Sequence, residues 1–211
     1  MKKIIVVLAV LALACGVAEA KKKNVPVVDG VYRAYYPSGG ILKEEYYKNE
    51  NLEGVSSEYY ENGKLKSTVG YANDLRVGKG ETYYETGVIK TQAFYKNGEL
   101  DGLFREYDKD GKLSREVNYD AGVLSGGGKT YYPSGAVAKQ MFYRKAVLDG
   151  SAIEFNEDGT LKAEESYSNG ALIERRLMES SGKLVAGDNP VASASKPAAA
   201  ASDKAAEPAK K

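Results

Sequence analysis

Hydrophobic and polar positions recur along residues 30–186 with a period of 24 residues. The stretch EYYENGKLK at 58–66 shows the pattern: two aromatic residues, a short polar segment ending in glycine, then an aliphatic residue. Six copies follow one another without insertion, which is typical of a single stacked array. The columns are an aromatic residue at Tyr35, Tyr59, Tyr83, Tyr107, Tyr131 and Phe155, an aliphatic one at Ile41, Leu65, Ile89, Leu113, Val137 and Leu161, and a tyrosine at Tyr47, Tyr71, Tyr95, Tyr119, Tyr143 and Tyr167.

Two turn signals in each copy predict a β-hairpin. The first is a glycine that follows Asn, Asp, Ser or Thr, and the second is Asn97-Gly98 or its equivalents Asn73-Asp74, Ala121-Gly122 and Asn169-Gly170. Such pairs favour hairpin turns because glycine adopts positive φ freely. Two turns in 24 residues leave strands of about six to eight residues. We therefore expect an all-β fold, an elongated antiparallel meander of tandem hairpins whose single sheet curls on itself. The turn glycines are Gly39, Gly63, Gly87, Gly111, Gly135 and Gly159.

The repeat also predicts the register of each hairpin. A three-residue loop at 61–63, with Gly63 in the left-handed conformation, sets Tyr59 opposite Leu65. Strand alternation then extends their face to Tyr71, so that the recurring columns gather on one side of the sheet. The other side is mostly polar, as in an antiparallel sheet with one solvated face. The expected repeat core is Tyr59, Leu65, Tyr71, Tyr83, Ile89, Tyr95, Tyr107, Leu113, Tyr119, Tyr131 and Tyr143.

A second aromatic follows the first in four copies, at Tyr36, Tyr60, Tyr84 and Tyr132. Alternation predicts that these four tyrosines face away from the core column. Spaced tyrosines on a surface can anchor a protein interface or stack on sugar rings. The alternative is that they form cross-strand packing pairs that stabilise the sheet. Both interpretations stay open at this point.

The two ends of the chain differ from the repeat. Residues 1–20 have a basic start, an apolar run and an Ala-Glu-Ala site, which together predict a secretory signal peptide. Residues 21–29 are expected to form a linker. Residues 187–211 are rich in Ala, Pro and Lys, and this composition predicts a disordered tail. We expect an exported bacterial protein of the periplasm or cell surface, with the basic tail as one means of peripheral membrane association.

Cys15 leaves the processing of the leader open. The residues before it resemble a bacterial lipobox, in which the cysteine becomes the lipidated first residue, and this reading predicts an outer-membrane lipoprotein. The alternative is cleavage after Ala20, which removes Cys15 with the leader. The chain then has no cysteine for a disulfide or a thiolate metal site.

Composition excludes most catalytic classes. The chain has no His and no Trp, and its net charge is +1. The absence of His removes the commonest general base and the commonest metal ligand, and the balanced charge disfavours nucleic-acid binding. Adjacent carboxylates such as Glu44-Glu45 lie on a strand and point to opposite faces, so they cannot flank one substrate. We expect no catalytic, cofactor or metal residues and no enzymatic activity.

The residues Gly54, Tyr59, Tyr60, Gly63, Leu65, Tyr71 and Gly78 resemble the MORN repeat, in the variant found in bacterial exported and antitoxin-like proteins. The resemblance covers 30–186, including a capping half-repeat at the end. The chain departs from the family pattern at two places. Arg76 stands where the other repeats have Leu, and residues 126–128 are three consecutive glycines. The resemblance implies stacked hairpins that bind proteins, and in some members lipid headgroups, without catalytic residues.

The leading hypothesis is a non-catalytic exported scaffold that binds a protein partner or a cell-envelope polymer through its extended sheet face. One alternative is a carbohydrate- or peptidoglycan-binding module that uses the spaced surface tyrosines. Another is an antitoxin-like or inhibitory protein that acts by occlusion.

Overall fold

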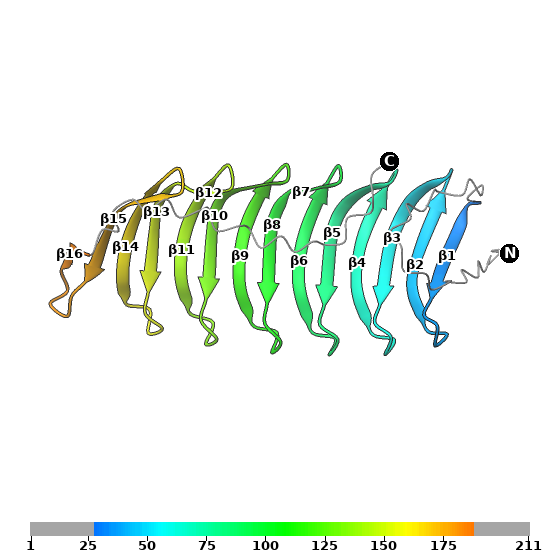
Figure 1. Cartoon of the computed structure of the whole chain (residues 1–211), viewed down its shortest axis with the longest axis horizontal. Helices are drawn as coiled ribbons and strands as arrows, with labels where there is room; N and C mark the ends of the chain where they lie inside the picture. Colours follow the sequence, from blue (N-terminus) through cyan, green and yellow to red (C-terminus); the bar gives the residue numbers. More distant parts are fainter. Residues whose placement is uncertain (1–27, 188–211) are drawn as a thin grey trace, which may run out of the picture. The chain divides into compact units, whose positions relative to one another are not determined.

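The computed structural model describes residues 28–187, and every regular element in that range is a β-strand (Figure 1). The chain divides after Lys112 into two compact units, which are described separately. The predicted signal peptide, Cys15, most of the predicted linker and the tail beyond Gly187 lie outside the described residues. The all-β class and the tandem antiparallel hairpins are confirmed.

Each unit is a meander in which most strands that follow one another in sequence are hydrogen-bonded neighbours. The short β7 pairs only with β6, and the short β12 only with β11, so β6 pairs next with β8 and β11 with β13. The first unit contains β1 (Gly30–Tyr35), β2 (Ile41–Lys48), β3 (Asn51–Tyr59), β4 (Leu65–Ala72), β5 (Leu75–Tyr83), β6 (Ile89–Lys96), β7 (Glu99–Leu100) and β8 (Gly102–Tyr107). The second contains β9 (Leu113–Asp120), β10 (Val123–Tyr131), β11 (Val137–Arg144), β12 (Val147–Leu148), β13 (Gly150–Phe155), β14 (Leu161–Ser168), β15 (Ala171–Met178) and β16 (Leu184–Ala186).

The first turn of each repeat has the predicted three-residue loop. The Tyr60 amide donates to the Lys64 carbonyl at 2.8 Å, and the Gly63 amide donates to the Tyr60 carbonyl at 2.9 Å. Gly63 has φ +79°, and the six glycines of this column all lie between +79° and +95°. Tyr59 pairs with Leu65, which confirms the predicted register.

The second turn is a two-residue loop in which both residues have positive φ. Asn97 and Gly98 have φ of +51° and +89°, the signature of a type I′ hairpin. The four second turns predicted from Asn and Gly pairs are all present. Two further turns, at 49–50 and 145–146, contain no glycine and were not predicted, although their residues also adopt positive φ.

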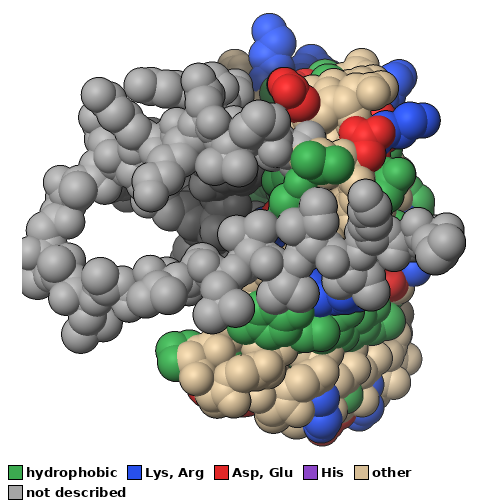
Figure 2. All heavy atoms as spheres, turned by 90° about the vertical axis from the view of Figure 1, so that its right-hand side faces the viewer, with side chains coloured by type: hydrophobic (Ala, Val, Ile, Leu, Met, Phe, Trp, Pro, Cys, Tyr) green, Lys and Arg blue, Asp and Glu red, His purple; other side chains and the backbone are tan. Residues whose placement is uncertain are grey.

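The two faces of each sheet differ sharply in burial. We call the face that carries Val69, Tyr71 and their paired neighbours the packed face, and the face that carries Glu81, Gln92 and Phe94 the open face. An end-on space-filling view shows hydrophobic side chains gathered in a band, with charged side chains at its margins (Figure 2). Among the described residues, the buried non-glycine residues all lie on the packed face: Leu52, Ser56, Thr91, Ala93, Val117, Leu124, Ala152, Ala163 and Glu165.

One expectation about the faces is wrong. The Tyr83 hydroxyl donates to Glu81 Oε2 at 2.9 Å, and the Tyr107 hydroxyl donates to Gln92 Oε1 at 3.0 Å. Tyr131 likewise donates to Glu116, so the tyrosines of this column that make these bonds lie on the open face rather than with Tyr71, Tyr95, Tyr119 and Tyr143. The cause is a β-bulge: Thr82 pairs with Thr91 and Tyr83 with Ile89, which skips one residue. At the bulge two residues of one strand oppose one residue of the other, so Tyr83 and its pairing partner Ile89 need not lie on the same face of the sheet.

Small residues on the packed face let the tyrosines lie flat on the sheet. A Cβ on Gly80 would stand 2.7 Å from Tyr95 Cε2 and 3.3 Å from Val69 Cγ2. Arg76, the departure from the aliphatic column, places its guanidinium 4.9 Å from the centre of the same Tyr95 ring. This cation–π contact explains how a cation replaces leucine at that position.

The final half-repeat continues the hairpin pattern. Met178 on β15 pairs with Leu184 on β16, and the Glu179 amide donates to the Lys183 carbonyl at 2.9 Å. Gly182 has φ +78°, in the range seen for the other turn glycines. The predicted capping half-repeat is therefore a real hairpin, although polar Glu179 replaces the aromatic residue.

Gly80 is required at its position because the Tyr95 ring leaves no room for a side chain there. We expect Gly80→Ala to lower the free energy of unfolding by about 1–3 kcal/mol, because the added methyl overlaps the ring. Gly127→Ala is the matched control, since nothing lies within 4 Å of its added Cβ, and its free energy should stay within about 0.5 kcal/mol. Denaturant unfolding followed by circular dichroism measures both. Equal effects of the two substitutions would contradict the close approach of Tyr95.

Candidate binding surface

The four tyrosines predicted as binding residues are hydrogen-bonded to the next hairpin. The Tyr36 hydroxyl donates to the Tyr59 carbonyl at 2.7 Å, and the Tyr60 hydroxyl donates to the Tyr83 carbonyl at 2.6 Å. The same bond recurs from Tyr84 to Tyr107 and from Tyr132 to Phe155, each at 2.8 Å. These bonds join consecutive repeats and favour the packing interpretation. A role of the rings in ligand binding stays a prediction.

Removing one of these hydroxyls should weaken the array without altering its surface. We expect Tyr60→Phe to lower the free energy of unfolding by about 1 kcal/mol, because the Tyr83 carbonyl loses its side-chain donor. Urea titration measures the change in midpoint. Tyr46→Phe is a suitable control, since Tyr46 is 38% exposed, and it should leave the midpoint unchanged. A Tyr60→Phe midpoint equal to that of the wild type would contradict the proposed inter-hairpin role.

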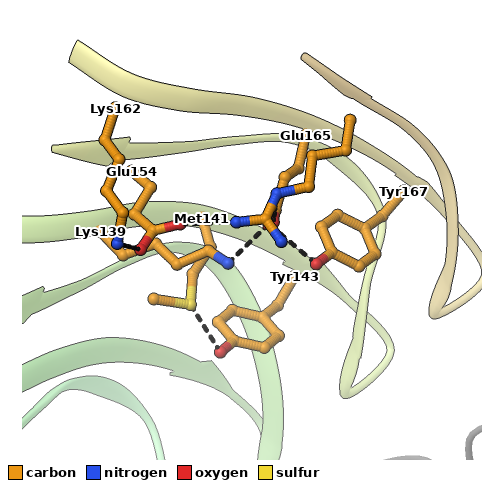
Figure 3. Close-up of polar contacts among 8 residues, drawn as sticks. Lys139, Met141, Tyr143, Glu154, Lys162, Glu165 and Tyr167 are labelled. Carbon is orange, nitrogen blue, oxygen red and sulfur yellow. Dashed lines mark hydrogen bonds and ion pairs between the residues drawn. The ribbon is translucent and has the colours of Figure 1, made fainter. Parts of the chain in front are cut away.

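Charged side chains form a cluster on the packed face of the second unit (Figure 3). Glu165 lies at its centre with 5% of its surface exposed. Its Oε2 accepts hydrogen bonds from Lys139 Nζ at 2.6 Å and from the Tyr167 hydroxyl at 2.9 Å, and Arg175 Nε lies 3.4 Å from its Oε1. Glu154, paired with Lys162 at 2.6 Å, joins the cluster through Arg175 at 3.4 Å.

A smaller cluster of the same kind lies in the first repeat. Lys43 Nζ is 2.7 Å from Glu45 Oε1, and the Tyr47 hydroxyl is 3.5 Å from Glu45 Oε2. Glu45 and Glu165 occupy the same repeat position. The four repeats between them carry Val69, Ala93, Val117 and Met141 there.

Burial and ion pairing shift the pKa values of these groups in opposite directions. Burial acts to raise the pKa of Glu165, but hydrogen bonds from Lys139 and Tyr167 and the charges of Lys139 and Arg175 outweigh it, so the pKa is lowered. Burial, aided by the hydrogen bond to Glu165, raises the pKa of Tyr167 to about 12. Neither shift places a titrating group near neutral pH, so the cluster is a structural ion network rather than an acid–base pair.

The lowered pKa of Glu165 predicts a pH dependence of stability. A carboxyl with a depressed folded pKa stabilises the fold above its unfolded pKa, near the ordinary value of 4.5, and loses that contribution as pH falls through the folded value. We expect Glu165→Gln to be less stable than wild type at pH 7, and the difference to shrink below about pH 4.5.

Urea midpoints between pH 2.5 and pH 7 measure this difference. Glu157→Gln, at an exposed turn residue, is the control and should follow the wild type at every pH. A difference between Glu165→Gln and wild type that is constant with pH would contradict the ion network.

A second periodicity, of 48 residues, appears on the open face. Every other repeat has a large aromatic residue before its conserved tyrosine, and the same repeats have a cation after that tyrosine. The intervening repeats have Gly70, Asn118 and Ser166 at the aromatic position. The aromatics are Tyr46, Phe94 and Phe142, with exposed fractions of 38%, 43% and 43%, and the cations are Lys48, Lys96 and Arg144.

Each of these aromatics lies beside bare backbone. A Cβ on Gly102 would lie 3.7 Å from Phe94 Cβ, and one on Gly150 would lie 3.9 Å from Phe142 Cβ. On its other side, Phe94 pairs with Lys79, whereas Phe142 pairs with Gly127. An aromatic ring flanked by glycine stays accessible to a partner, and exposed aromatics next to Arg or Lys are typical interface anchors.

A solvent-open depression of about 290 Å³ lies on the second unit, around the glycine that pairs with Phe142. The Asn118 side-chain amide donates to the Gly127 carbonyl at 2.9 Å and helps to fix one wall. The lining residues are Glu116, Asn118, Gly127, Gly128, Lys129, Gln140 and Met141.

These residues were not predicted from the sequence, because the prediction rested on the 24-residue period alone. The first tyrosines and glycines recur in every repeat and conceal the alternation at the position before Tyr47, Tyr95 and Tyr143. Comparing alternate repeats with each other reveals it. The signal was therefore present in the sequence.

The family model described as MORN repeat variant matches residues 28–49, 52–73, 76–97, 100–121 and 148–169, slightly more than half of the chain. The chain belongs to the MORN repeat family, as the sequence resemblance indicated. The family indicates a repeat-based binding scaffold. The repeat at 124–145, which forms the hairpin of β10 and β11, is not matched and supplies five of the seven residues that line the depression. No curated protein sequence matches the chain.

Within 28–187 there is no group of three or more His, Cys, Asp or Glu residues arranged to hold a metal ion. In the same range, no helix has the length and apolarity needed to cross a membrane.

Proposed function

We propose that the chain is a non-catalytic, exported scaffold that binds a protein partner through the open face of its sheet. The observation that supports this most directly is the alternation of exposed aromatics and cations on that face. The same side-chain pair, aromatic then cation two residues later, recurs at Tyr46 and Lys48 and at Phe94 and Lys96 in the first unit. Export rests on the leader-like residues 1–20.

The geometry of the first unit suits an extended protein surface. Tyr46 lies on β2 and Phe94 on β6, four strands apart in the meander, which corresponds to about 19 Å. That spacing fits two anchor points within one protein interface of ordinary size. The cations at Lys48 and Lys96 favour a partner that presents carboxylates beside apolar side chains.

The packed face is a poorer candidate. Its core positions are occupied by Val69, Ala93, Val117 and the tyrosines that lie across Gly80 and Gly128, so a partner would have to displace packed side chains. The polar groups of its clusters at Glu45 and Glu165 already bind one another. A ligand would therefore gain little from them.

The open face of the first unit is tested by site-specific photocrosslinking in the native cell envelope. A benzophenone amino acid replaces either Tyr46 or Lys96, and we expect one discrete protein to be captured from both positions. When Phe94→Ala is added to either photocrosslinking variant, capture should fall at least tenfold, because an aromatic residue in an interface contributes about 2 kcal/mol or more to binding. Western blotting of the crosslinked band measures the effect.

Two controls make the experiment decisive. The same amino acid at Asn62, an exposed turn residue, should not capture that protein. Phe94→Tyr keeps the ring and should preserve capture. Equal capture from Asn62, or capture that is unchanged by Phe94→Ala, would contradict the proposed interface.

A further inference from the structure

The depression in the second unit has a feature that the first unit lacks. In the first unit Phe94 is paired with Lys79, whose ammonium group lies 2.7 Å from Glu81 Oε1. At the equivalent position of the second unit, Phe142 is paired with Gly127, and nothing lies within 4 Å of a Cβ built there. Phe142 is not itself a lining residue, but its ring is exposed and its pairing partner Gly127 lines the depression.

Backbone conformation does not require this glycine. Gly126 has φ +82°, which disfavours other residues, and a Cβ on Gly128 would stand 3.0 Å from Tyr143 Cε2 and Val117 Cγ1. Gly127 has neither a positive φ nor a close neighbour. Of the three consecutive glycines it alone is free of a structural reason, and its effect is to keep the depression open.

The lining of the depression is polar and electrically balanced. One carboxylate, Glu116, and one ammonium group, Lys129, accompany the amides of Asn118 and Gln140. Glu116 Oε1 accepts a hydrogen bond from the Tyr131 hydroxyl at 2.8 Å, which orients the carboxylate. Such a lining supplies both donors and acceptors without excess charge. It favours neither an anionic polymer nor an apolar ligand.

We propose that this depression binds a neutral saccharide, with Phe142 as the stacking platform and Glu116, Asn118, Lys129 and Gln140 as hydrogen-bond partners. A sugar presents hydroxyl groups around its edge and C–H groups on its faces, and these match the polar lining and the exposed ring. The volume of about 290 Å³ suits a mono- or disaccharide unit rather than a large ligand. This site differs from the predicted tyrosine site, since it uses none of Tyr36, Tyr60, Tyr84 and Tyr132.

The full chain is tested on an array of neutral oligosaccharides that includes N-acetylglucosamine and glucose oligomers. The best retained glycan is then titrated calorimetrically. We expect Phe142→Ala and Gly127→Lys each to weaken its binding at least tenfold. Gly127→Lys reproduces the Lys79–Phe94 pair of the first unit, so the fold accommodates the lysine while the depression is filled. Thermal unfolding confirms that both variants are folded.

Phe94→Ala is the matched control, because it removes the equivalent ring in the first unit, away from this depression, and it should leave saccharide affinity unchanged. Absence of any retained neutral glycan overturns the proposal, as does retention of anionic glycans alone. Binding that survives both Phe142→Ala and Gly127→Lys also overturns it. The protein-partner hypothesis is tested separately, since Gly127→Lys should not alter crosslinking from Tyr46 or Lys96.

Discussion

The architecture depends on backbone turns that recur at equal chain intervals. Each repeat contains a left-handed glycine in its three-residue turn and two residues with positive φ in its second turn. Because these turns come 24 residues apart, equivalent side chains of successive hairpins align across the sheet. The alignment lets Tyr60 bond to Tyr83 and Tyr84 to Tyr107. It also lets four of the second turns donate to the strand that follows the second turn of the repeat before, as the Gly98 amide does to the Arg76 carbonyl at 2.9 Å. A stacked array gains stability from such nearest-neighbour contacts.

The sequence was sufficient for the fold class, the repeat, the turn glycines and the pairing of Tyr59 with Leu65. These features are local, since they depend on the residues of each turn and on a 24-residue pattern that recurs in six copies. The face of the Tyr83 column was not predictable in the same way, because a single bulged residue reverses a side chain without altering the pattern. The turn at 145–146 was also missed, since Lys145 and Ala146 carry no intrinsic preference for positive φ and are held there by the flanking strands.

The two faces divide structural and functional demands between them. The packed face contains the buried residues and the ion clusters, and two of its tyrosines, Tyr95 and Tyr143, lie directly on Gly80 and Gly128. The open face is constrained less by packing, and it is there that the 48-residue alternation appears. A pattern that packing does not demand is a stronger sign of recognition than one that it does. The residues of the candidate binding surface were harder to predict than the fold, because packing does not dictate which side chains the open face carries.

The position shared by Glu45 and Glu165 bears on how such a protein changes in length. In the four inner repeats this position is apolar, whereas the first and sixth repeats place a carboxylate there. Glu45 pairs with Lys43 of its own repeat, and Glu165 pairs with Lys139 of the repeat before it. Gene duplication of an inner repeat would insert another apolar layer between compatible neighbours. Duplication of the first or sixth repeat would bring a second carboxylate into the interior of the array, where desolvation is costly. The charged positions of the first and sixth repeats therefore favour lengthening of the array by duplication of its inner repeats.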